Sequence, residues 1–154
     1  MIMRTFSLFV VALFLFVTQA DAQQLTIEMT GQSGPSNILS AELNWQKPQA
    51  TTGQSRRRGR VQVEDLVVTR KPGRDTPGAL QNLTSGSVIQ EIVIRSMNGN
   101  DATFTMTLSN AMISAHSLSM DTKRSMETFS ITFEKISFEH ASGSKHEYSV
   151  VSGR

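Results

Sequence analysis

The stretch from residue 59 to residue 95 constrains the fold more than any other part of the chain, because it predicts two strands joined by a short helix. Apolar and polar side chains alternate from Val61 onwards, as they do in a half-buried strand. Pro72 and Gly73 end that strand, since proline has no N–H to donate to a β-ladder and glycine favours turns. The return strand, residues 88–95, is rich in isoleucine and valine.

The segment between these strands carries the signals of a helix start and a helix end. Asp75 and Thr76 are good N-cap residues, and Pro77 suits the first turn because the N–H that proline lacks has no partner there. Gly86 is the expected left-handed stop, since glycine reaches positive φ without a steric cost. We therefore expect a short helix that ends at Gly86.

Three large side chains are expected in the core. Leu80 and Leu83 are three residues apart and so share one face of the helix. Because a helix this short is not stable alone in water, we expect both leucines to plug an opening in the sheet. Trp45 is expected to be a core tryptophan at the end of a strand over residues 38–45, with Leu39 on the same face.

Period-two alternation predicts the remaining strands. They are expected at residues 25–29, 104–109, 128–133 and 147–151, with a polar loop at 116–126. The apolar parity slips by one residue between Val63 and Leu66, between Leu108 and Ile113, and between Phe133 and Ile136. A β-bulge produces such a slip, and bulges bend strands where a sheet curls. The chain is therefore predicted to be all-β: a barrel of two curled antiparallel sheets with one short α-helix packed on its side.

Several short motifs follow one another in a familiar order and spacing. They are Gly59-Arg60-Val61, Glu64-Asp65-Leu66, Thr69-Arg70, Asp75-Thr76-Pro77 with Leu80, and Gly86 with Ile89-Gln90-Glu91. This set resembles the signature of the Hcp (haemolysin-coregulated protein) family, the tube proteins of the bacterial type VI secretion system. The resemblance covers about residues 24–140. Gly73 departs from it, because the family often has an acidic residue there.

The N-terminus has the features of a secretory signal peptide, which tube proteins usually lack. Arg4 precedes the apolar run from Phe6 to Val17, and Ala20-Asp21-Ala22 has the small-x-small pattern of a cleavage site. The run is too short for a membrane span, which needs about 20 apolar residues. An uncleaved membrane anchor is the alternative. We expect residues 1–22 to be removed and residues 23–154 to form one Hcp-like barrel domain, secreted or periplasmic in a Gram-negative bacterium.

The composition excludes several kinds of chemistry. The chain has 0 Cys, so thiol nucleophiles, disulfides and Cys-based metal sites are ruled out. A net charge of +2 is too small to argue for nucleic acid. No nucleophile elbow, phosphate-binding loop or zinc-protease motif occurs. His140 and His146 flank a turn beside acidic residues, which is weak evidence for a metal site. We expect no catalytic residues, no metal, no cofactor and no enzyme activity.

Two surfaces are candidates for binding partners. One is the polar loop over residues 46–58, which ends in the densest charge cluster of the chain: Arg56, Arg57, Arg58 and Arg60. The resemblance implies an inter-ring or partner loop here, and a solvated loop is the alternative. The other surface consists of hydroxyl-rich strand faces, which are candidates for a lumen or subunit face: Thr103, Thr105 and Thr107, and Thr128, Ser130 and Thr132. An ordinary strand surface is the alternative there.

The resemblance implies a structural role. A family member would form a ring, expected to be homohexameric and able to stack, that can carry secreted effector proteins in its lumen and contact other type VI components. The alternative is an exported monomeric β-barrel binding module that kept the fold without building a tube. Neither reading requires nucleic acid, or a membrane span after signal cleavage.

Overall fold

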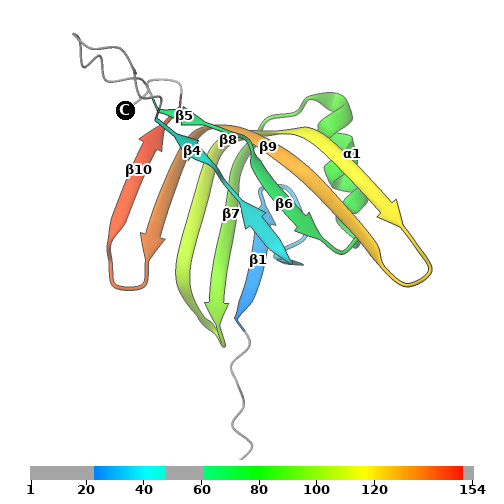
Figure 1. The fold of residues 1–154 in the computed structure, drawn as a ribbon, viewed down its shortest axis with the longest axis horizontal. Coiled ribbons are helices and arrows are strands. Elements are labelled where there is room, and N and C mark those ends of the chain that lie inside the picture. The colour runs from blue at the N-terminus through cyan, green and yellow to red at the C-terminus, as the bar shows by residue number, and fades with distance from the viewer. Residues whose placement is uncertain (1–22, 48–60, 151–154) are drawn as a thin grey trace, which may run out of the picture.

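The computed structural model describes residues 23–47 and 61–150, which form a curled β-sheet with one helix behind it (Figure 1). The strands are β1 (Gln24–Met29), β2 (Ser36–Ile38), β3 (Ser40–Glu42), β4 (Trp45–Gln46), β5 (Gln62–Val63), β6 (Leu66–Arg70), β7 (Ile89–Asn98), β8 (Asp101–Met120), β9 (Ser125–His140) and β10 (Lys145–Ser149). The helix is α1 (Thr76–Ser85). No helix among the described residues combines the length and the apolar character that crossing a membrane requires.

The main sheet is antiparallel and has the strand order β2-β1-β7-β8-β9-β6-β3, with β10 also paired to β9. Only Leu39 separates β2 from β3, yet β2 pairs with β1 at one edge and β3 pairs with β6 at the other. The Leu39 N–H donates to the Thr69 carbonyl at 2.8 Å. This short segment therefore joins the two edges and nearly closes the sheet into a barrel. The predicted all-β barrel is confirmed, and its two curled halves share the long strands β8 and β9.

The predicted parity slips in β8 and β9 lie side by side. Buried positions change from Leu108 to Ala111 and Ile113 in β8, and from Ile131 to Ile136 in β9. Asn110, the one described non-glycine residue with positive φ (51°), lies at the change in β8. Its side chain donates to Glu134 Oε2 at 2.8 Å, directly across on β9. Asparagine tolerates this conformation well, so one residue turns both strands without breaking the ladder.

The helix begins and ends where the sequence predicts, but it packs differently. Asp75 is the N-cap residue, proline follows in the first turn, and Gly86 has φ 64°. Ala79 is fully buried, whereas Leu83 is half-buried and Leu80 is 36% exposed. The prediction that both leucines plug the sheet is therefore wrong for Leu80. A small side chain faces the sheet, which lets the helix lie close to it.

Three other sequence-based expectations are also wrong. Trp45 is 37% exposed because β4 pairs with β5, outside the main sheet, and its ring packs against the rings of Phe138 and Tyr148. Leu39 is 52% exposed because it is the crossing point between two sheet edges. The polar loop expected at residues 116–126 is mostly strand: β8 runs to Met120 and β9 starts at Ser125. The polar, serine-rich sequence does not predict a strand here, but pairing between β8 and β9 satisfies the backbone hydrogen bonds of both.

Candidate functional site

Thr105, Thr107 and the whole second set lie on the face of the sheet that points away from the core, whereas Thr103 is unpaired at a bulge and bonds to the buried Ser96. Directly paired residues of an antiparallel sheet share a face, so each set can be placed by its partners. Thr107 pairs with Ser137 next to the buried pair Leu108 and Ile136, and Ser130 pairs with Val67 next to the buried residue Ile131. The two sets are at opposite ends of β8 and β9, separated by the bend at Asn110. They form two surfaces and not one.

The first set, Thr103, Thr105 and Thr107, has charged neighbours. Thr105 lies between Arg95 on β7 and Glu139 on β9. Arg95 Nη1 is 2.8 Å from Glu28 Oε2, so an exposed ion pair continues the same face. Thr103 Oγ1 donates to the Ser96 carbonyl at 3.0 Å. This face therefore carries charges of both signs among its hydroxyl groups.

The second set, Thr128, Ser130 and Thr132, keeps the expected character. Thr128 lies 3.2 Å, oxygen to oxygen, from Thr69 on β6, and Thr132 donates to the Met112 carbonyl at 3.3 Å. The other residues paired with this set are small or neutral: Val67, Ala115 and Ser117. The charged residues described near it lie at its margin: Glu42 pairs with Val67, Asp65 accepts a hydrogen bond from Ser114, and Glu134 lines a groove together with Thr132. We name this surface the hydroxyl face.

Beneath this part of the sheet lies a buried ionic cluster that the sequence analysis missed. Glu127 has no exposed surface, and its Oε1 accepts from Arg70 Nε at 2.5 Å and from Thr76 Oγ1 at 3.0 Å. Its other oxygen is 3.1 Å from His116 Nε2, which donates because an ionised carboxylate can only accept. Four elements therefore meet at one carboxylate: β6, α1, β8 and β9.

The charges of the cluster balance locally. Burial alone would raise the pKa of Glu127, but the hydrogen bond from His116, the hydrogen bond and charge of Arg70, and the hydrogen bond from Thr76 together lower it below the usual glutamate value. The Arg70 guanidinium also lies over the Phe129 ring, 5.2 Å from its centroid. Its Nη2 atom is buried without a hydrogen-bond partner. Every strong contact is internal, so the cluster has the geometry of a structural support.

This cluster gives a physical reason for two of the family-like motifs. Arg70 of Thr69-Arg70 and Thr76 of Asp75-Thr76-Pro77 both bind Glu127. Asp75 accepts a hydrogen bond from Ser36 on β2, and the Gly73 N–H donates to Thr76 Oγ1 at 2.9 Å. These residues fix the start of α1 against the barrel. The sequence did carry a signal for the burial of Glu127: in the alternating pattern of this strand it is on the same side as Phe129 and Ile131, which are buried.

The remaining candidates are the arginine cluster and the histidines. Arg56, Arg57, Arg58 and Arg60 lie outside the described residues. His140 is exposed and its Nδ1 is 2.9 Å from Ser142 Oγ. The part of the chain that the structure describes contains no group of three His, Asp or Glu side chains placed to hold a metal ion.

Comparison with known proteins agrees with this fold. Residues 26–140 match the family described as "Type VI secretion system effector, Hcp". The structure of Hcp1 from Salmonella typhimurium is similar, with 17% identity, a TM-score of 0.69 and coverage of 84% of this chain and 96% of that one. The structure of a type VI secretion system effector from Yersinia pestis is also similar, with 17% identity, a TM-score of 0.65 and coverage of 82% of this chain and 99% of that one.

A third similar structure is the secreted protein Hcp3 from Pseudomonas aeruginosa, with 17% identity, a TM-score of 0.60 and coverage of 82% of this chain and 96% of that one. At these identities the structural similarity shows a shared fold. A comparison with curated proteins finds no significant match.

Proposed function

The chain belongs to the type VI secretion system effector family Hcp, and from that premise we propose that residues 23–154 act as a tube-like, ring-forming subunit and not as an enzyme. The observation that carries this proposal is the hydroxyl face. It is a strand surface without charged side chains at its centre, on a barrel whose other surfaces carry charges of both signs.

A ring gives a physical reason for such a face. Identical subunits around an axis repeat each side chain at close spacing, so any charge facing the axis meets copies of itself. Neutral hydroxyls avoid this repulsion and can still hydrogen-bond to water or to a bound protein. We therefore assign Thr128, Ser130 and Thr132 to a lumen that can hold secreted effector proteins. Thr103, Thr105 and Thr107 are assigned to a separate subunit face.

The proposal includes partners and a route. The partner is a second copy of the chain, most simply in a homohexameric ring that can stack, with type VI components as further partners. The arginines at positions 56–58 and 60 are proposed to contact the next ring or a partner. The N-terminal apolar run supports export through a signal peptide to the periplasm or the medium. No cofactor or metal is needed.

The test is the particle mass of the exported protein, measured by size-exclusion chromatography with light scattering. A ring-sized particle of several subunits is the expected result. A monomer at all concentrations would favour the alternative, an exported barrel that binds partners without building a tube. Release of product from a broad substrate panel would contradict the assignment as a non-enzyme.

A further inference from the structure

Two exposed surfaces of opposite charge lie at opposite ends of the hydroxyl face. The first is the tip of the β8–β9 hairpin, residues 120–126, which extends beyond the other strands on the right of Figure 1. Met120 is 76% exposed there. Lys123 and Arg124 follow it, and with Lys71 they border a groove of about 710 Å³ that also contains Leu39 and Pro72.

The cations at this groove have no acidic partner among the residues that the structure describes. None of Lys71, Lys123 and Arg124 forms an ion pair with another described residue. The single acid of the turn, Asp121, is engaged locally, since its Oδ1 accepts from the Thr122 N–H at 2.6 Å. An exposed methionine beside two unpaired cations is typical of a surface that is covered by a partner.

The second surface is a groove of about 490 Å³ where β8 and β9 bend, beside the start of β7. Its apolar walls are Val88, which is 57% exposed, Met112, which is 37% exposed, and the half-buried Phe133. Glu134 lines the same groove and forms no ion pair with any described residue; its Oε2 accepts from Asn110. Asp65 lies close by, bonded to Ser114 just beyond Met112. Among the described residues, no lysine or arginine lines this groove.

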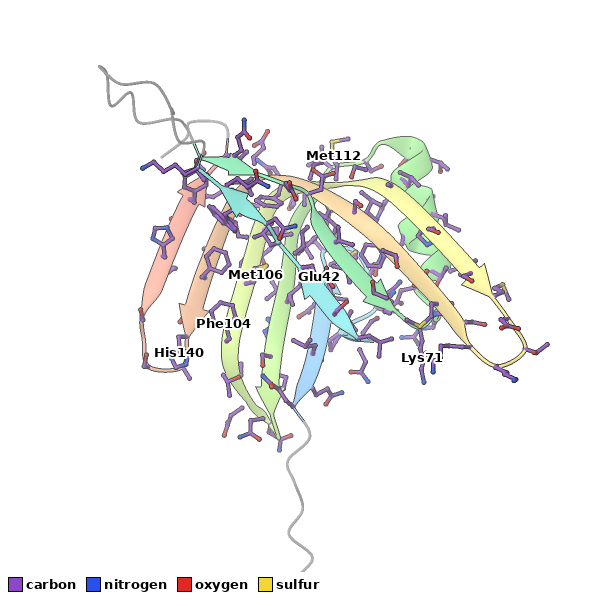
Figure 2. All side chains as sticks on the ribbon, in the orientation of Figure 1. Glu42, Lys71, Phe104, Met106, Met112 and His140 are labelled. Carbon is purple, nitrogen blue, oxygen red and sulfur yellow. The ribbon has the colours of Figure 1, made fainter. Side chains whose placement is uncertain are left out.

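The two surfaces are far enough apart to bind different copies. Glu134 is eight residues after Met126 in β9, which corresponds to roughly 26 Å of strand. Figure 2 shows Lys71 and Met112 at different ends of this part of the sheet. Thr128, Ser130 and Thr132 occupy the strand between them.

We propose that the hairpin tip of one copy inserts into the acidic groove of the next. Met120 then lies against Val88, Met112 and Phe133, while Lys123 and Arg124 meet Glu134 and Asp65. Such a contact is heterologous, because each copy offers a different surface at each end, and heterologous contacts generate rings when the rotation closes. The inference rests on the proposed ring, and it places the hydroxyl face on one continuous wall between successive contacts.

Cysteine cross-linking tests the contact directly, because the chain has 0 Cys of its own. Met120→Cys and Met112→Cys are prepared as separate full-length variants and mixed under mild oxidation. The expected product is a heterodimer that forms faster than either homodimer. Within one chain the two positions are about 26 Å apart along β8, too far for a disulfide, so the double variant should give a ladder of linked subunits.

Charge reversal supplies the second readout. Lys123→Glu with Arg124→Glu should raise the concentration needed for assembly by at least about tenfold, because complementary charges orient such contacts. Adding Asp65→Lys with Glu134→Lys restores opposite charges and should bring that concentration most of the way back to the wild-type value. The control is Lys47→Glu with Lys145→Glu, which changes the net charge equally elsewhere. If the wild type forms a ring but the cysteine variants do not cross-link and the charge reversal does not change assembly, this contact is overturned and the proposed function stands. A wild-type monomer overturns both.

Discussion

Glu127 shows how much of this fold depends on one buried side chain. Its carboxylate is the shared acceptor for Arg70, Thr76 and His116, which come from β6, α1 and β8. Removing one partner from a buried pair leaves the other charge without compensation, and this costs more than the pair itself contributes. The support for the helix is therefore more sensitive to a single substitution than its hydrophobic contacts through Ala79 and Leu83 would suggest.

We expect Glu127→Gln to lower the free energy of unfolding by about 3 kcal/mol, because Arg70 would remain buried without a counter-charge. Urea unfolding measures this loss. Glu64→Gln is the matched control and should change stability little, because Glu64 is exposed and its described side-chain partners are the neutral Asn44 and Gln46. Equal effects of the two substitutions would contradict the role of the cluster.

The same carboxylate gives a pH dependence with a definite sign. The pKa of Glu127 is lower in the folded protein than the usual glutamate value, so its contribution to stability is present at neutral pH. It is lost as pH falls below the usual glutamate range towards the lowered folded value. Acid titration of stability in that window should be steeper for the wild type than for Glu127→Gln.

The helix α1 is an element whose ends are set locally and whose packing is set by the sheet. Its N-cap, its proline and its left-handed glycine are all near in sequence. Its buried side chains, Thr76 and Ala79, are determined by what lies opposite, and the larger Leu80 remains exposed. Helix stability here comes from close approach and from the ionic cluster more than from leucine burial.

Ala79→Leu should therefore destabilise the protein by about 1–3 kcal/mol, because extra methylenes must enter a closed contact. Leu80→Ala is the control and should change stability by less than about 0.5 kcal/mol, as surface substitutions usually do. Leu83→Ala should fall between them, since that side chain is half-buried against the core. Denaturant melts rank the three, and a larger loss for Leu80→Ala than for Ala79→Leu would contradict this packing.

As an assembled particle, the protein should respond to charge on one face more than on the other. Ser130→Lys introduces a cation at the centre of the neutral hydroxyl face. Thr105→Lys introduces one between Arg95 and Glu139, where charges of both signs are already present. We expect Ser130→Lys to weaken assembly or cargo retention at low salt. Assembly should recover at about 1 M salt, because the Debye length is then about 3 Å and the repulsion between the added charges is screened.

Light scattering at two salt concentrations measures the effect, and circular dichroism verifies that both variants are folded. Thr105→Lys is the matched control and should assemble more like the wild type. Unchanged particle mass and cargo binding for Ser130→Lys at low salt would mean that the hydroxyl face points to bulk water, and the lumen assignment would be dropped.

Export is the other property of the whole chain that can be tested. We expect the mature protein to start at Gln23, and Ala22→Arg to leave the precursor uncleaved, because signal cleavage requires a small residue there. N-terminal sequencing of periplasmic or medium protein measures this. An intact Met1 on exported protein would contradict the signal-peptide prediction.

Features that depend on neighbouring residues could be predicted from the order of the amino acids. Alternation predicted the strand at residues 25–29, capping residues and glycine predicted the ends of α1, and the parity slips predicted that β8 and β9 bend. Each of these is controlled by local dihedral preference and by which side of one strand is apolar. The family-like motifs could also be recognised in the sequence, but the contacts with Glu127 and Ser36 that explain them could not.

The contacts of each side chain depend instead on how distant segments of the chain come together. Trp45 and Leu39 are exposed because β4 lies outside the main sheet and because residue 39 is a crossing point, and neither fact is local. Glu127 is buried because Arg70, Thr76 and His116, each distant in sequence or on another strand, satisfy its charge. Burial and charge compensation depend on long-range pairing, which alternation along one strand cannot specify.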